Sequence, residues 1–170
     1  MAGTLSFDPQ LIIDKYYPEG TPLRDIYMRH ARSVADLALE IATRKHLALD
    51  PAQIEAAALL HDIGIYLCDA PGIHCHGTEP YISHGPLGAA LLRQEGAPEW
   101  AARVAERHTG TGLGKMIPET ELERLICYAD KFYSKSGSMQ RKTLPAVEAS
   151  MAKFGPQNLA RFRALHSQFS

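Results

Sequence analysis

The sequence has little that would suit export or membrane insertion. Its 170 residues include only three cysteines, an odd number that does not make a disulfide framework. No run of about 18 apolar residues is present that could span a bilayer, so no membrane partner is expected. The first seven residues lack the basic and apolar regions of a secretory signal. These absences predict a cytoplasmic protein with reduced thiols.

An excess of charge of either sign is also missing. Eighteen Lys and Arg residues face 19 Asp and Glu residues, which gives a formal net charge of −1. General nucleic-acid binders usually carry a basic excess, so binding to a nucleic-acid duplex is not expected. The length fits one domain over residues 1–170, with a core at about 22–136 and C-terminal helices at about 145–169.

Helical periodicity runs through the whole sequence, and no convincing alternating strand interrupts it, which predicts an all-α fold. Asp, Ser and Pro at helix starts and Gly or Pro after helix ends predict helices at about 8–16, 22–46, 51–62, 86–94, 98–108, 118–135, 145–154 and 156–169. Residues 67–83 contain several Pro and Gly residues and are expected to form a long loop. The apolar residues of the last two helices suit either a homodimer face or packing on the core, and we expect the core.

Six titratable residues interrupt the apolar faces of these helices: His30, His61, Asp62, His84, His108 and Asp130. Four of them lie three or four residues from apolar side chains on the same helix face, and the adjacent pair at 61–62 ends the most apolar helix. A lone inward histidine is usually a hydrogen-bonded core residue, but an unpaired buried carboxylate is unfavourable by several kcal/mol. Because all six need a shared explanation, the sequence predicts that they converge on a bound divalent metal.

The order of these residues resembles the HD-domain metal-dependent phosphohydrolase superfamily, in particular its small stand-alone members. The resemblance runs from about His30 to Lys131, and its most specific parts are Leu60-His61-Asp62-Ile63-Gly64 and Tyr128-Ala129-Asp130-Lys131. It implies a helical core with the metal ligands His30, His61, Asp62 and Asp130. It also implies a second ion held by His84 and His108, with Asp62 bridging the two. The expected cofactor is therefore a pair of divalent transition-metal ions (Fe, Mn, Co, Ni or Zn), and Mg is also compatible.

The resemblance implies a phosphohydrolase that cleaves a phosphoester or phosphoanhydride bond of a small phosphorylated, nucleotide-like molecule. A phosphomonoesterase, a phosphodiesterase and a dinucleoside polyphosphate hydrolase all fit this description. Two metal ions would lower the pKa of a water between them and supply a hydroxide that attacks phosphorus. His61, Asp62 and Lys131 are the expected catalytic residues, with Lys131 either binding a substrate phosphate or standing as a solvated surface lysine. Residues 107–112 lack the Gly-Tyr-Pro element of the cyclic-di-nucleotide phosphodiesterase branch, which disfavours that branch.

Two other functions stay open, a di-iron oxygenase of HD-like fold and a catalytically silent nucleotide-binding module. Two further features have weaker claims. Arg107 and Lys115 flank a glycine-rich segment, residues 110–114, which is either an anion-binding loop or a plain helix connection. The His74-Cys75-His76 segment is either a separate soft-metal site or part of the rim of the active site.

Overall fold

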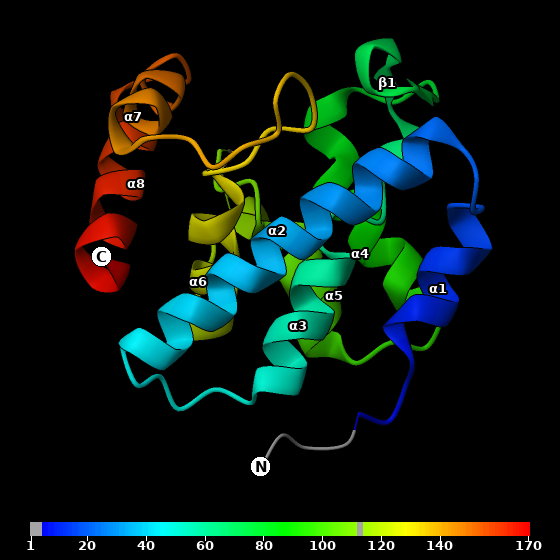
Figure 1. Cartoon of the computed structure of the whole chain (residues 1–170), viewed down its shortest axis with the longest axis horizontal. Coiled ribbons are helices and arrows are strands. Elements are labelled where there is room, and N and C mark those ends of the chain that lie inside the picture. Colours follow the sequence, from blue (N-terminus) through cyan, green and yellow to red (C-terminus); the bar gives the residue numbers. More distant parts are fainter. Residues whose placement is uncertain (1–4, 112–113) are drawn as a thin grey trace.

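The computed structural model describes residues 5–111 and 114–170, and over these ranges the chain is a bundle of α-helices, as predicted (Figure 1). The α-helices are α1 (Pro9–Tyr16), α2 (Pro22–Arg44), α3 (Pro51–Leu60), α4 (His84–Gln94), α5 (Glu99–Arg107), α6 (Glu121–Asp130), α7 (Leu144–Ala152) and α8 (Pro156–Phe169). Helix α1 and the α7–α8 pair lie at opposite ends of the molecule, with α2 running between them. None of the helices in these ranges is both long and apolar enough to cross a membrane.

Helix starts follow the capping residues in the sequence. The Asp8 side chain accepts a hydrogen bond from the Gln10 backbone N–H at 2.9 Å, and Asp50 accepts one from Ala52 at the same distance. Thr120 caps α6 together with Glu123 in a reciprocal capping box, so α6 begins at Glu121 rather than at residue 118. Local chemistry therefore sets these boundaries before any tertiary contact is made.

Two predicted boundaries were wrong at the C-terminal ends of helices. Helix α3 ends at Leu60, one residue before the pair at 61–62. Helix α6 ends at Asp130 instead of near residue 135. The carbonyls of residues 128–130 accept bonds from backbone N–H groups three residues later, and these tighter turns end the regular helix.

The expectation that no strand is present was also wrong, although only locally. Within the 67–83 segment, β1 (Asp69–Ala70) pairs antiparallel with β2 (Cys75–His76), and short 3₁₀ turns lie around them. Each strand is two residues long, which is too short to produce a recognisable alternation of polar and apolar residues.

The helices enclose two clusters of buried apolar side chains that meet along α2. Val34 and Ile41 belong to the cluster shared with α6, α7 and α8, whereas Tyr27 belongs to the cluster shared with α1 and α4. Val147, Met151, Phe162, Leu165 and Phe169 of the C-terminal helices are buried in the first cluster. The expected packing of these helices on the core is therefore confirmed for the residues facing it. His30 lies on α2 between the two clusters.

Candidate metal centre

The six predicted ligands come from different parts of the fold and converge where the two apolar clusters meet. His30 belongs to α2, His61 and Asp62 follow α3, His84 begins α4, His108 follows α5, and Asp130 ends α6. The five residues other than Asp130 are buried, and Asp130 is partly exposed. The structure therefore brings together all six residues, and their role as metal ligands stays a prediction.

In the first group of ligand atoms, two histidines face one oxygen of Asp130 and one oxygen of Asp62. The Nε2 atom of His30 lies 2.9 Å from Asp130 Oδ1 and 3.2 Å from Asp62 Oδ2. The Nε2 atom of His61 lies 3.2 Å and 3.1 Å from the same two oxygens. All four residues offer ligand atoms within 4.8 Å of one another, which is compact enough to surround a single cation.

The other oxygen of Asp62 faces a second group. Its Oδ1 atom lies 3.4 Å from His84 Nε2 and 3.2 Å from His108 Nε2. These three residues also fall within 4.8 Å of one another. Asp62 is thus common to both groups and turns one oxygen towards each.

Backbone hydrogen bonds orient three of the histidines. The Nδ1–H group of His61 donates to Ala58 O at 2.6 Å, and that of His108 donates to Ala105 O at 2.8 Å. His84 makes the same bond to the carbonyl of Tyr81. A proton on Nδ1 leaves Nε2 with its lone pair, the form in which imidazole binds a metal.

This arrangement fits a cation at the centre. The Nε2 atoms of His84 and His108 are 2.9 Å apart, and two lone pairs at that distance repel unless a proton or a metal lies between them. Both oxygens of Asp62 are buried and accept no well-formed hydrogen bond from the described residues, and Lys135 Nζ lies 3.0 Å from Oδ2. Lys135 compensates part of the negative charge, and the nitrogen and oxygen donors around Asp62 suit a divalent cation.

The charges of the cluster shift its pKa values strongly. Burial alone would lower the pKa of His61, but the carboxylates of Asp62 and Asp130 raise it to about 10. Burial lowers the pKa of His108 to about 4 against the opposing effect of Asp62, so this imidazole is neutral. Burial opposes ionisation of Asp62, yet His61 and Lys135 hold its pKa well below the usual range. In the metal-free protein a cation must therefore displace the proton of His61.

Two glycines allow the helices to approach closely enough to form the cluster. A Cβ atom at Gly64 would lie 2.5 Å from His84 O and 2.6 Å from Gly88 N. A Cβ atom at Gly85 would lie 2.9 Å from Ala105 O, where α4 packs on α5. Gly64 therefore lets the turn at 61–64 pack closely against the start of α4.

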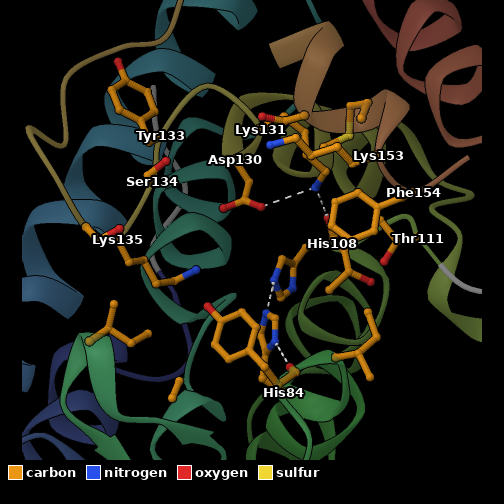
Figure 2. Close-up of a pocket in the computed structure, with 18 of the residues that line it drawn as sticks. His84, His108, Thr111, Asp130, Lys131, Tyr133, Ser134, Lys135, Lys153 and Phe154 are labelled. Carbon is orange, nitrogen blue, oxygen red and sulfur yellow. Dashed lines mark hydrogen bonds and ion pairs between the residues drawn. The ribbon is translucent and has the colours of Figure 1, made fainter. Parts of the chain in front are cut away.

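The cluster opens into a cavity of about 770 Å³. His84, His108 and Asp130 are among its lining residues, and Figure 2 shows Lys135 on one side of them and Phe154 on the other. Four lysines line this cavity: Lys131, Lys135, Lys142 and Lys153. An anionic ligand is therefore favoured next to the cluster.

The HD domain family model matches residues 27–134 of this chain, which include all six residues of the cluster. The chain belongs to the HD domain family. The resemblance drawn from the residue order is confirmed, and the family assignment covers the helices from α2 to α6.

Curated relatives of this HD domain protein are archaeal. A tRNA (cytidine(56)-2'-O)-methyltransferase of Thermoplasma volcanium is 28% identical over 96% of this chain and 47% of its own length. A protein of the same name from Picrophilus torridus is 27% identical over 86% of this chain and 42% of its own length. An uncharacterized protein of Methanocaldococcus jannaschii is 31% identical over 61% of this chain and 63% of its own length. The chain thus spans about half the length of the two methyltransferases, and comparison with solved structures gives no match.

Two lysines of the HD domain protein touch the cluster directly. Lys131 Nζ lies 3.3 Å from Asp130 Oδ2 and donates to His108 O at 2.8 Å, so its description as a solvated surface lysine was wrong. Lys135 Nζ lies 3.0 Å from Asp62 Oδ2 and 5.5 Å from the ring centroid of Tyr81. Lys135 was not predicted from the sequence, because it follows the end of α6 and shares no helical face with Asp130.

Arg107 and Lys115, which flank the glycine-rich segment, do not line the cavity. Arg107 donates to Ile117 O at 2.8 Å and pairs with Glu119 at 2.9 Å, so it holds the loop that follows α5. Lys115 is exposed and does not line the cavity. In the glycine-rich segment, Gly112 and Leu113 lie outside the described residues, and Thr111 lines the cavity.

The loop at 74–76 does not form a metal site of its own, separate from the cluster. His74 and His76 are exposed while Cys75 between them is buried, so their side chains do not converge. No group of metal-binding side chains is found there within the described ranges. The neighbouring Ala70, Gly72 and Ile73 line the cavity, which supports the other prediction, that this loop borders the active site.

Proposed function

We propose that this HD domain protein is a metal-dependent phosphohydrolase that cleaves a phosphoester or phosphoanhydride bond of a nucleotide-like small molecule. The proposal is carried by one observation. A carboxylate shared between two groups of ligand atoms lies beside a cavity lined by four lysines. Groups able to bind cations and groups able to bind phosphate therefore surround the same volume, which supports hydrolysis of a phosphorylated substrate.

In this proposal the first cation is held by His30, His61, Asp62 and Asp130, and the second by Asp62, His84 and His108. Bound divalent cations lower the pKa of coordinated water and neutralise charge on phosphoryl oxygens. The protein's own contribution is to position the substrate. The ammonium groups of Lys131 and Lys135 lie beside Asp130 and Asp62, where they can donate to the phosphoryl oxygens of a bound substrate.

The lysines also bear on the competing functions. A di-iron oxygenase would use the same histidines and carboxylates but would not need four ammonium groups around its cavity. A silent nucleotide-binding module would not need five further ligand residues arranged around a shared carboxylate. The names of two relatives add methyl transfer to tRNA as a further candidate function. More than half of the length of each of these proteins lies outside the match, so the names alone do not assign that activity to the matched part.

The test combines metal analysis with an activity panel. Purified protein is assayed for bound metals and then for phosphate release from nucleotides and simple phosphoesters with Mn, Co, Fe, Ni, Zn or Mg, both under anaerobic conditions and in air. A parallel assay offers tRNA and a methyl donor. Metal-dependent phosphate release is expected. Oxygen-dependent turnover restricted to iron would establish the oxygenase instead, and methyl transfer to tRNA without phosphate release would replace hydrolysis with the relatives' activity.

A further inference from the structure

The lysines of this protein are concentrated at one place. The three lysines outside the cavity are Lys15, Lys45 and Lys115, so four of the seven in the sequence line it. Asp130 is the only acidic side chain among its lining residues in the described ranges, and no arginine lines it there. In a chain with a net charge of −1, this is a local positive excess aimed at one ligand.

The four lysines divide into an inner and an outer pair. Lys131 and Lys135 are paired with Asp130 and Asp62. Lys142 and Lys153 have no ion-pair partner among the described residues, although both line the cavity. The outer pair therefore supplies positive charge that the cluster itself does not compensate.

Apolar side chains are also exposed in the wall of this cavity. Only three large hydrophobic residues of the described ranges are exposed: Leu11, Ile82 and Phe154. Ile82 and Phe154, exposed by 47% and 62%, both line the cavity. Figure 2 shows the Phe154 ring facing into it next to Lys153. An exposed aromatic face beside unpaired ammonium groups suits a ligand that carries both a flat ring and a negative charge.

The outer residues also lie beyond the part of the chain that the family model matches. That match ends at residue 134, whereas Lys142, Lys153 and Phe154 follow it in the segments on either side of α7. The cluster and the outer wall of the cavity are thus supplied by different stretches of sequence, and the outer wall is the part able to set which substrate this chain accepts.

We propose that Lys142, Lys153 and Phe154 form a second subsite that binds the substrate beyond the scissile phosphoryl group. The two ammonium groups hold a second phosphate, and the Phe154 ring stacks on an aromatic base. The preferred substrate is then a nucleoside diphosphate or a longer nucleoside polyphosphate, rather than a monophosphate or a phosphosugar. This inference rests on the proposed hydrolysis at the cluster. A cavity of about 770 Å³ is within the range of small-molecule sites.

Equilibrium binding tests the subsite without turnover. The probe is adenosine 5'-(α,β-methylene)diphosphate, titrated into metal-loaded protein. The double substitution Lys142→Ala/Lys153→Ala is expected to raise the Kd of this probe at least tenfold. The control Lys45→Ala/Lys115→Ala removes the same charge elsewhere and should stay within twofold of wild type. Equal affinity in wild type and the Lys142/Lys153 variant would overturn the subsite.

The ring contact has its own control. Phe154→Ala should weaken the adenosine probe at least threefold while leaving methylenediphosphonate, which has no ring, unchanged. Leu11→Ala removes an equally exposed apolar side chain on α1 and should change neither. Equal loss for both probes in Phe154→Ala would overturn the stacking role. A single-stranded ten-nucleotide RNA that binds wild type more tightly than the adenosine probe would replace the nucleotide with an RNA end.

Kinetics separate failure of the subsite from failure of the proposed function. With ADP, the Lys142→Ala/Lys153→Ala variant should show a KM at least tenfold higher and an unchanged kcat, while the control Lys45→Ala/Lys115→Ala should keep the wild-type KM. Equal KM values for ADP would overturn the subsite and leave hydrolysis standing. A wild-type protein that hydrolyses nothing with any metal would refute the proposed function, and the binding titrations would still decide whether the subsite exists.

Discussion

The substitution Gly64→Ala tests whether close packing of the turn at 61–64 on α4 builds the second ligand group. The new Cβ atom would meet His84 O at 2.5 Å and Gly88 N at 2.6 Å. Both are backbone atoms, so neither can rotate away. Because carbon contacts are favourable only from about 3.5 Å, the turn and α4 must separate by roughly 1 Å.

That separation has a calculable effect on the cluster. Asp62 Oδ1 and His84 Nε2 are 3.4 Å apart, and roughly 1 Å more would remove His84 from the shared group. Overpacking of this kind costs about 1–3 kcal/mol, which corresponds to a Tm lower by roughly 3–10 °C in a chain of this size. A misplacement of about 1 Å at a reacting centre can lower the rate about 100-fold. The group formed by His30, His61 and Asp130 does not depend on α4 and should persist.

The assay is metal stoichiometry by mass spectrometry, together with Tm and kcat. Gly64→Ala is expected to lose one metal equivalent, to melt earlier and to lose most of its activity. Gly72→Ala is the matched control for Tm and metal content, because a Cβ atom there has nothing within 4 Å. If Gly64→Ala kept the wild-type metal content and Tm, close approach at Gly64 would not be a requirement of the site.

Three further substitutions or conditions address single features of the centre. Asp62→Ala should abolish metal loading and turnover while circular dichroism still reports a helical fold, and normal metal content would refute the shared role of Asp62. Metal affinity should weaken about tenfold for each pH unit as the pH falls from 9 to 7, because a pKa of about 10 for His61 means that the cation displaces one proton. Competition with a metal-binding dye measures the Kd of the metal, and a Kd that stays constant over this range would contradict the prediction. Lys131→Met should raise the KM about 10- to 100-fold at unchanged metal content, since hydrogen bonds to charged groups contribute about 1.5–3 kcal/mol. An unaltered KM would leave Lys131 with only its contacts to Asp130 and His108.

The helices and the six clustered residues were predictable because their signals are local. Capping residues such as Asp8 and Asp50 begin helices without help from the rest of the chain. Inward polar residues stand out against an apolar helix face, so His30 and Asp130 could be identified from spacing alone. The order of the six residues then carried the resemblance to the HD domain family, which the family match confirms.

What the sequence did not reveal depends on contacts between distant segments. The sequence pattern predicted that the helix continues to about residue 135, and on such a helix Lys135 shares no face with Asp130. Nothing local therefore shows that Lys135 returns to within 3.0 Å of Asp62. Lys153 and Phe154 reach the cavity only because α7 packs on the core. The contact between Gly64 and the backbone of α4 is likewise invisible in the sequence, because it is defined by how two helices approach each other.

The three histidines anchored through Nδ1 all use a main-chain carbonyl three residues earlier as their partner. Such an acceptor exists whatever side chain stands at that position. The bond that fixes each imidazole ring is therefore independent of the side chains of residues 58, 81 and 105. The same arrangement can be used in protein design. A histidine placed just after the last turn of a helix can bond to the main-chain carbonyl three residues earlier, which fixes its tautomer without a second polar side chain.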